Sequence, residues 1–383
     1  MDRGYHQGGR KFNGFSQQAS KAEDPEAGKE PLYDEVRENF NAFLADRKHG
    51  QPFCYWWGPT NTHRKWVQGS GQKLWGIDPD KLKGIMPDFL PDVPVIREDF
   101  ADYLGEAQAV DAGLGVLLEE LEQRGELENT LVVVSGDHGI PGFPRGKTNL
   151  YDFGAHVALA IRWPGAAPGG RVLTDHVNLM DLAPTFLEAG GVPVPKVMTG
   201  KSLVPVLKSE KNGQVDAKRD YVIIGRERHV AKARQGGLPY PMRAIRTQHF
   251  LYVRNFKPKR WPMGTAPGFG LPAGDMPDYE TLRENTFAAF GDFDASPTKA
   301  YMLTHRDDPE IAPYIPLGFG RRPGEELYDL RKDPDQIHNL AEDPEYAATR
   351  EKLSRELMRV LNETQDPRVM GDGSTFDKPP FTD

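Results

Sequence analysis

Several side chains in this sequence could act together on an anionic substrate. His63 could be a general acid for a leaving oxygen or nitrogen, because the pKa of an imidazole lies near neutral pH. Lys147, within a glycine-bounded loop over residues 146–154, offers a positive charge to an oxyanion. The adjacent Asp137 and His138 combine a carboxylate with an imidazole, and such a pair suits a divalent cation.

Two further polar residues, Glu227 and His229, could hydrogen-bond the hydroxyl groups of a substrate. All of these residues also have structural explanations: a solvated turn, a surface lysine, a loop histidine or an exposed salt-bridged turn. The single cysteine, Cys54, lies in an apolar run, where a free thiol usually packs as a small hydrophobic group. The types of these residues therefore suggest a reaction at an anion. Their positions in the fold must decide between this function and the structural explanations.

The elements that would position these residues alternate between helices and continuous apolar strands. The patterns predict strands at 52–57, 131–134, 157–161 and 221–225, and helices from Leu32, at 97–124 and at 179–189. Apolar runs buried on both faces, alternating with helices, are typical of an α/β fold with a mostly parallel sheet flanked by helices. Ligands bind at the carboxyl ends of such strands, so we expect the candidate residues to meet at one edge.

The pattern changes after about residue 240. Residues 242–245 and 250–253 alternate as in a hairpin, residues 326–329 could form a strand, and 343–362 form an amphipathic helix. We therefore expect a catalytic α/β domain at 1–240 and a smaller antiparallel α+β domain at 241–383.

Composition excludes several classes of protein. The 383 residues include 56 acidic and 48 basic side chains, and the net charge of −8 weighs against nonspecific nucleic-acid binding. No apolar run approaches the ~18–20 residues of a membrane-spanning helix. One cysteine permits neither an internal disulfide nor a cysteine-based zinc site, and residues 1–6 lack the apolar region of a signal peptide. Compartment and oligomeric state stay open.

Taken together, these segments resemble the sulfatase family of the alkaline-phosphatase superfamily, most closely its sulfamidase-like, heparan N-sulfatase-like members. Residues 131–139 resemble the metal-ligand loop of that family, and 146–151 resemble the loop whose basic residue contacts sulfate. The remaining matches are the strand and active-site histidine at 52–64, the helix at 177–185 and the C-terminal signature at 326–341.

The resemblance implies hydrolysis of a sulfate ester or sulfamate on a sulfated sugar, with calcium as the metal and a formylglycine nucleophile. By that resemblance, Asp137 and His138 would be calcium ligands and Lys147 would bind the sulfuryl group. His63 would contact sulfate or protonate the leaving group. Glu227 and His229 would recognise the sugar.

One departure from the family is large. The formylglycine motif, Cys/Ser-x-Pro/Ala-x-Arg, does not occur in the sequence, and Cys54 is followed by Tyr-Trp-Trp. We therefore expect a C-terminal portion of a sulfatase that lacks the nucleophile, binds calcium poorly and has negligible turnover alone. Two alternatives stay open: a noncatalytic fragment that binds sulfated glycan, and a phosphodiesterase or phosphonate hydrolase of the same superfamily.

Overall fold

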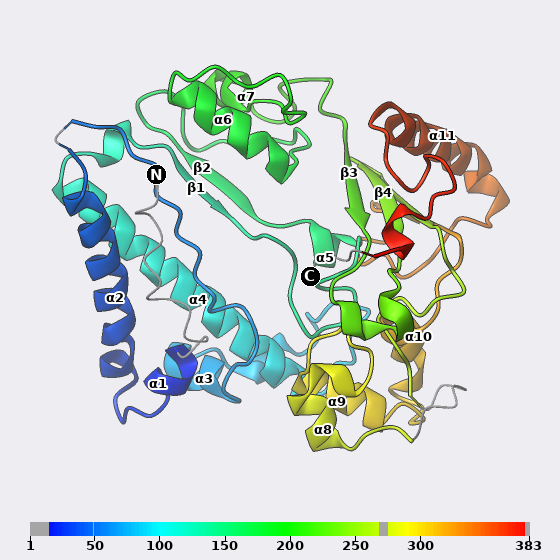
Figure 1. Cartoon of the computed structure of the whole chain (residues 1–383). Coiled ribbons are helices and arrows are strands. Elements are labelled where there is room, and N and C mark those ends of the chain that lie inside the picture. The colour runs from blue at the N-terminus through cyan, green and yellow to red at the C-terminus, as the bar shows by residue number, and fades with distance from the viewer. Residues whose placement is uncertain (1–14, 49, 268–274, 380–383) are drawn as a thin grey trace.

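The computed structural model of the protein describes residues 15–48, 50–267 and 275–379. Within these ranges a two-stranded ribbon lies between a pair of long helices and a four-stranded sheet (Figure 1). The helices are α1 (Phe15–Ala19), α2 (Pro25–Ala45), α3 (Ser70–Trp75), α4 (Pro94–Gln123), α5 (Asp152–Ala155), α6 (Leu182–Ala189), α7 (Val204–Lys208), α8 (Tyr279–Glu284), α9 (Pro297–Thr304), α10 (Ile315–Phe319) and α11 (Ala347–Glu363). None of the helices in these ranges has the length and apolar character needed to cross a membrane.

The long helices α2 and α4 lie side by side and bury one apolar stripe between them (Figure 1). Both were expected from their periodicity, but α2 begins earlier than Leu32. Asp24 caps it by accepting a hydrogen bond from the backbone N–H of Glu26 at 3.0 Å, and Pro25 occupies the first helical position. The buried stripe consists of Val36, Phe40 and Leu44 of α2 and Val116, Leu117 and Leu121 of α4.

The apolar run at 52–57 is extended but is not a strand, so this expectation was wrong. Phe53 and Tyr55 pack on the aromatic rings of Phe40 and Phe43, with ring centroids 4.9–6.4 Å apart. The alternate side chains of Cys54 and Trp56 are exposed, Trp56 to 87%. The run therefore packs by one face on α2, and no described strand pairs with its backbone.

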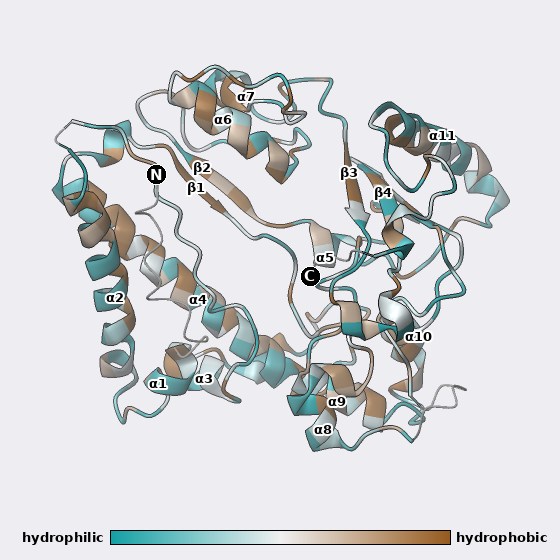
Figure 2. Cartoon of the chain, viewed as in Figure 1, coloured by the Kyte–Doolittle hydropathy of each residue, from teal (hydrophilic) through white to brown (hydrophobic). Residues whose placement is uncertain are grey.

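Strand β1 (Val132–Ser135) pairs with β2 (Leu159–Arg162) in an antiparallel ribbon, with Val133 opposite Ile161. Both strands were expected, and Figure 2 shows apolar residues along them. Their side chains are nevertheless half-buried rather than enclosed on both faces. The parallel pairing expected from the apolar runs is not found in the described ladders, all of which are antiparallel.

The second sheet has the strand order β3 (Tyr221–Arg226), β4 (Met242–Thr247), β5 (Phe250–Asn255) and β6 (Glu325–Asp329). The hairpin, the strand β6 and the helix α11 that packs on β4 and β5 match the expected antiparallel C-terminal unit. Strand β3 was expected in the first sheet but pairs with β4. A boundary at residue 240 would therefore pass between two paired strands.

A further cluster of side chains joins α4 to the segment between β5 and β6. Its buried aromatic residues are Phe89, Phe143, Phe290, Phe293 and Phe319. Lys299 of α9 is also fully buried here, and its ammonium group donates to the backbone carbonyls of Thr286 and Phe293 at 3.0 and 2.8 Å. The cluster thus packs Phe143, in the loop that follows β1, with Phe290 and Phe293, in the segment that leads to α9.

Candidate active site

The pair Asp137-His138 lies in the turn just after β1. The backbone N–H of His138 donates to Asp137 Oδ1 at 3.0 Å, and His138 Nε2 lies 3.4 Å from Asp137 Oδ2. The Asp137 side chain is 87% exposed. Gly139 then ties the turn to α5, because its N–H donates to the carbonyl of Gly154 at 2.9 Å.

Lys147 projects from a loop that is almost entirely buried. Its backbone N–H donates to the carbonyl of Ile140 at 2.9 Å, which closes the loop on itself. Gly146 makes this closure possible, because a Cβ at that position would lie 2.1 Å from the same carbonyl oxygen. The Lys147 ammonium group lies 3.6 Å from Asp294 Oδ2, and only 11% of the lysine side chain is exposed.

His229 lies beside this lysine. Burial lowers the pKa of His229, and the positive charge of Lys147 lowers it further, while Asp292 and Asp294 act in the opposite direction. Its Nδ1 is 3.9 Å from Asp292 Oδ1. Burial therefore favours the neutral imidazole, which can both donate and accept a hydrogen bond.

Asp292 is the fully buried carboxylate behind His229. It accepts hydrogen bonds from Arg226, at the end of β3, and from Arg234. Burial lowers the pKa of Arg226 to about 10, and Asp292 opposes this shift. Sequence reasoning missed both Asp292 and Asp294, which lie in a proline- and glycine-rich stretch without periodicity and more than sixty residues from His229.

Glu227 follows β3 but already has strong partners. Its carboxylate accepts hydrogen bonds from Arg243 at 2.8 Å and from Arg368 at 2.6 Å. Arg368 also donates to Asp377 at 2.9 Å, so the glutamate belongs to a partly buried ion-pair network that ties the C-terminal segment to the sheet. A sugar hydroxyl would have to compete with two guanidinium groups for this carboxylate.

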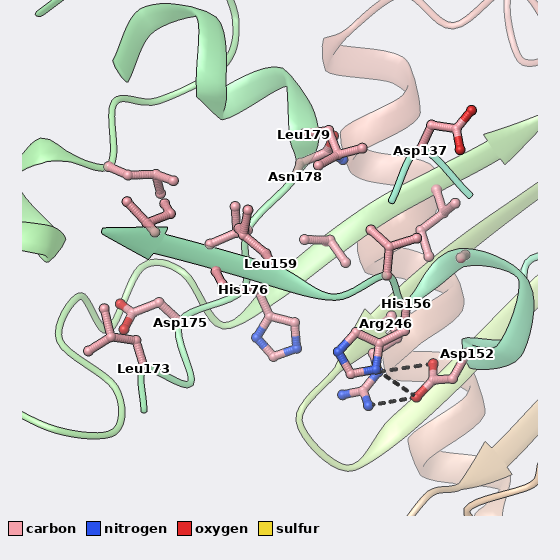
Figure 3. A pocket seen from close by; sticks show the side chains of 18 of the residues that line it. Asp137, Asp152, His156, Leu159, Leu173, Asp175, His176, Asn178, Leu179 and Arg246 are labelled. Atoms are coloured by element: carbon pink, nitrogen blue, oxygen red, sulfur yellow. Dashed lines mark hydrogen bonds and ion pairs between the residues drawn. The ribbon is translucent and has the colours of Figure 1, made fainter. Parts of the chain in front are cut away.

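One cavity of about 1570 Å³ brings most of the candidate residues together. It lies between β2, the segment that leads to α6, helix α7 and strand β3, and Figure 3 shows Asp137 at its wall. Its lining includes five of the six candidates, namely Asp137, His138, Lys147, Glu227 and His229.

His63 is exposed and does not line this cavity. It lies near the site all the same. Arg64 next to it donates from Nε to the carbonyl of Pro141 at 3.0 Å, and Pro141 lies between His138 and Lys147. The Arg64 guanidinium is fixed in turn by Asp99 of α4, with N–O distances of 2.6 and 2.9 Å.

A second polar group lines the same cavity and was not expected from the sequence. Arg246 of β4 donates to Asp152 of α5 at 2.9 Å, and His156 Nδ1 lies 3.7 Å from the same carboxylate (Figure 3). Burial, followed by the charge of Arg246, lowers the pKa of the nearby His176. The spacing of Asp152 and His156, one helical turn apart, was the sole sequence signal for this group.

The residues present do not make a complete cation site. Across the ranges that the structure describes, no three acidic, histidine or cysteine side chains gather around a possible metal position. Asp137 and His138 alone supply far fewer ligands than the 6–8 oxygens that calcium takes. The described residues alone therefore do not fit a calcium ion.

Comparison with known proteins identifies the family. The sulfatase family matches residues 2–192, and a C-terminal family named N-sulphoglucosamine sulphohydrolase matches residues 136–257. Human N-sulphoglucosamine sulphohydrolase is 32% identical over 301 residues, which cover 76% of this chain and 53% of that protein. The chain thus spans about half the length of the curated relatives it matches.

Solved structures show the same fold at low sequence identity. A protein in complex with its substrate D-glucosamine-2-N,6-O-disulfate superposes with a TM-score of 0.54 and 18% identity, over 89% of this chain and 72% of that chain. The phosphonate monoester hydrolase of Agrobacterium radiobacter superposes with a TM-score of 0.51 and 18% identity, over 86% and 60% of the two chains. The sequence matches and the shared fold together establish that the chain belongs to the sulfatase family.

Proposed function

We propose that this chain forms the sulfuryl-binding part of a hydrolase that cleaves sulfuric esters or sulfamates of a sulfated sugar. The observation that carries the proposal is the cavity that Lys147 shares with Asp137, His138 and His229. The family membership supports it, as does the relative named for hydrolysis of N-sulphoglucosamine.

Each residue has a proposed role that follows from its surroundings. Lys147 would bind the sulfuryl oxygens, because its ammonium group is partly desolvated and reaches the cavity wall. His229, whose neutral form is favoured by burial, would hydrogen-bond a sugar hydroxyl. Glu227 would do the same only where its arginine partners leave a lone pair free.

The proposed roles of Asp137, His138 and His63 need more than the described residues provide in this arrangement. Asp137 and His138 would supply two of the ligands of a calcium ion only where further oxygen ligands complete the site. His63 would protonate the leaving oxygen or nitrogen if its loop, held by Arg64 at Pro141, moved toward the cavity. Because the sequence has no formylglycine motif, we expect binding of sulfated sugar with negligible turnover by this chain alone.

Calorimetry with glucosamine N-sulfate and with sulfated oligosaccharides tests this proposal. We expect binding that Lys147→Ala abolishes and that Lys65→Ala leaves unchanged, since Lys65 is an exposed lysine paired with Glu284. Binding that is absent, or equal in the Lys147→Ala variant, would overturn the proposal. Rapid sulfate release by the pure chain would instead refute our expectation about the missing nucleophile.

A matched pair of compounds, one leaving group carrying either sulfate or phosphate, separates this function from phosphoester or phosphonate hydrolysis. The shared fold of the phosphonate monoester hydrolase does not decide between them. We expect the sulfated compound to bind more tightly, because the Lys147 ammonium group beside the partly buried Asp294 suits a singly charged sulfate ester better than a doubly charged phosphate monoester. Tighter binding of the phosphate compound would favour the alternative.

A further inference from the structure

The backbone that carries Lys147 requires restraint from its surroundings. Thr148, the next residue, has a φ of 75°, in the left-handed region that a β-branched residue rarely adopts. Its hydroxyl donates to the carbonyl of Asp292 at 3.2 Å. A conformation of this kind persists only when neighbouring groups hold it, so the side chains around the loop decide where Lys147 points.

Asn149 is the side chain that closes the loop from the inside. It is buried, and its amide nitrogen donates to the carbonyls of Gly146 at 3.0 Å and of Lys147 at 3.3 Å. Its amide oxygen accepts a hydrogen bond from Arg322. One side chain therefore connects the backbone of Lys147 to a buried guanidinium from a distant part of the chain.

Arg322 lies just before β6 and is itself fixed by the core of the C-terminal sheet. Its guanidinium lies 5.0 Å from the ring centroid of Tyr151. Tyr151 donates to Glu326 of β6 at 2.7 Å, and Glu326 also accepts from Tyr328 at 2.7 Å and from Asn255 at 2.6 Å. Burying a guanidinium carries a desolvation cost that the surrounding hydrogen bonds and charges must offset, so Arg322 depends on these partners for its position.

We propose that Arg322 is a positioning residue that acts through Asn149 to hold Lys147 toward the cavity. The inference rests on the proposed function, in which Lys147 binds the sulfuryl group. It adds that the C-terminal sheet sets the position of the group that binds the anion, through the contact of Arg322 with the Tyr151 ring and its hydrogen bond to Asn149.

Lysine acylation followed by mass spectrometry tests the positioning without any substrate. In the wild type, Lys147 should react slowly, because its side chain is largely buried and held. In Asn149→Ala and in Arg322→Met we expect the acylation of Lys147 to be about tenfold faster, which corresponds to the loss of one hydrogen bond that holds the loop. The fully buried Lys299 is the internal reporter and should stay protected if the fold is intact.

Two further variants sharpen this test. Tyr240→Phe is the matched control, since it changes a buried hydroxyl next to Arg322 that has no hydrogen-bond partner. It should leave the acylation of Lys147 unchanged. In the double variant of Arg322 and Asn149, the two effects should not add, because both break the same chain. Removing a buried guanidinium can unfold the protein, and Asn149→Ala then carries the test if Lys299 becomes labelled in Arg322→Met.

Calorimetry with glucosamine N-sulfate adds the functional readout. We expect Asn149→Ala to bind about tenfold more weakly than the wild type, and Tyr240→Phe to bind equally well. If Lys147 and Lys299 both stay as protected in Asn149→Ala as in the wild type, the positioning role is overturned. If Lys147→Ala binds the sugar normally, the proposed function fails, while the acylation result still decides the positioning.

Discussion

Replacing Asp292 by asparagine removes one negative charge that two buried arginines share. The Asp292 side chain is 0% exposed, and those of Arg226 and Arg234 are each 6% exposed. Asparagine has nearly the same size, so the substitution leaves no cavity and isolates the loss of charge. The guanidinium groups would keep their backbone acceptors, which include the carbonyl of Pro262 at 3.0 Å from Arg226.

The expected loss of stability follows from these contacts. Breaking a buried ion pair and leaving a charge uncompensated costs about 3–5 kcal/mol. Because both arginines keep backbone partners, we expect the lower end, about 3 kcal/mol, for Asp292→Asn. Glu284→Gln is the matched control, since the Lys65–Glu284 pair has side chains that are 53% and 48% exposed. That change should cost less than about 1 kcal/mol.

Urea unfolding of both variants measures the two losses of unfolding free energy, from the midpoint of the transition and its slope against urea concentration. A loss for Asp292→Asn no larger than that for Glu284→Gln would show that the buried arginines are satisfied without the carboxylate. An NMR titration gives a second check. Asp292 raises the pKa of His229, so the pKa of that imidazole should fall further in Asp292→Asn.

Three further predictions concern pH and metal. Burial raises the pKa of Asp102 from 3.8 to about 7, so the folded chain binds more protons than the unfolded chain between these pH values. The free energy of unfolding should therefore fall as pH rises from 3.8 to about 7. Thermal melts of Asp102→Asn should not show this dependence on pH. Burial lowers the pKa of Lys299 from 10.5 to about 7, so stability should rise with pH between these values, and Lys299→Met should remove that rise in the same melts. Adding calcium at about 1 mM should not change the melting temperature of the wild type or of Asp137→Asn, because a site with two ligands binds the ion at best in the millimolar range. A rise on adding calcium in the wild type alone would reveal ligands that we have not identified.

Elements whose signal is local were predicted well from the sequence. Helix α4, the β4–β5 hairpin and helix α11 each follow from periodicity over a dozen or so neighbouring residues. The strands β1, β2, β3 and β6 were also placed, because short apolar or alternating runs bounded by turn residues indicate extended chain wherever the partner lies.

The partners of the strands were not predictable in the same way. The apolar runs of β1 and β3 suggested one parallel sheet, whereas β1 pairs with β2 and β3 with β4, both antiparallel. The run at 52–57 has the composition of a buried strand and has no ladder partner in the described part of the chain. An apolar run indicates that the segment is buried, but it does not identify the element that packs on it, because that depends on residues elsewhere in the chain.

The sequence by itself determined the candidate groups and the short spacings between them: Asp137-His138 directly after an apolar run and Lys147 ten residues later. The tertiary structure alone decided that Asp292 lies behind His229 and that Arg322 reaches Asn149. These contacts join residues 60 or more positions apart. Their energies depend on burial and on the direction of a hydrogen bond, and neither quantity is encoded in the periodicity of a local segment.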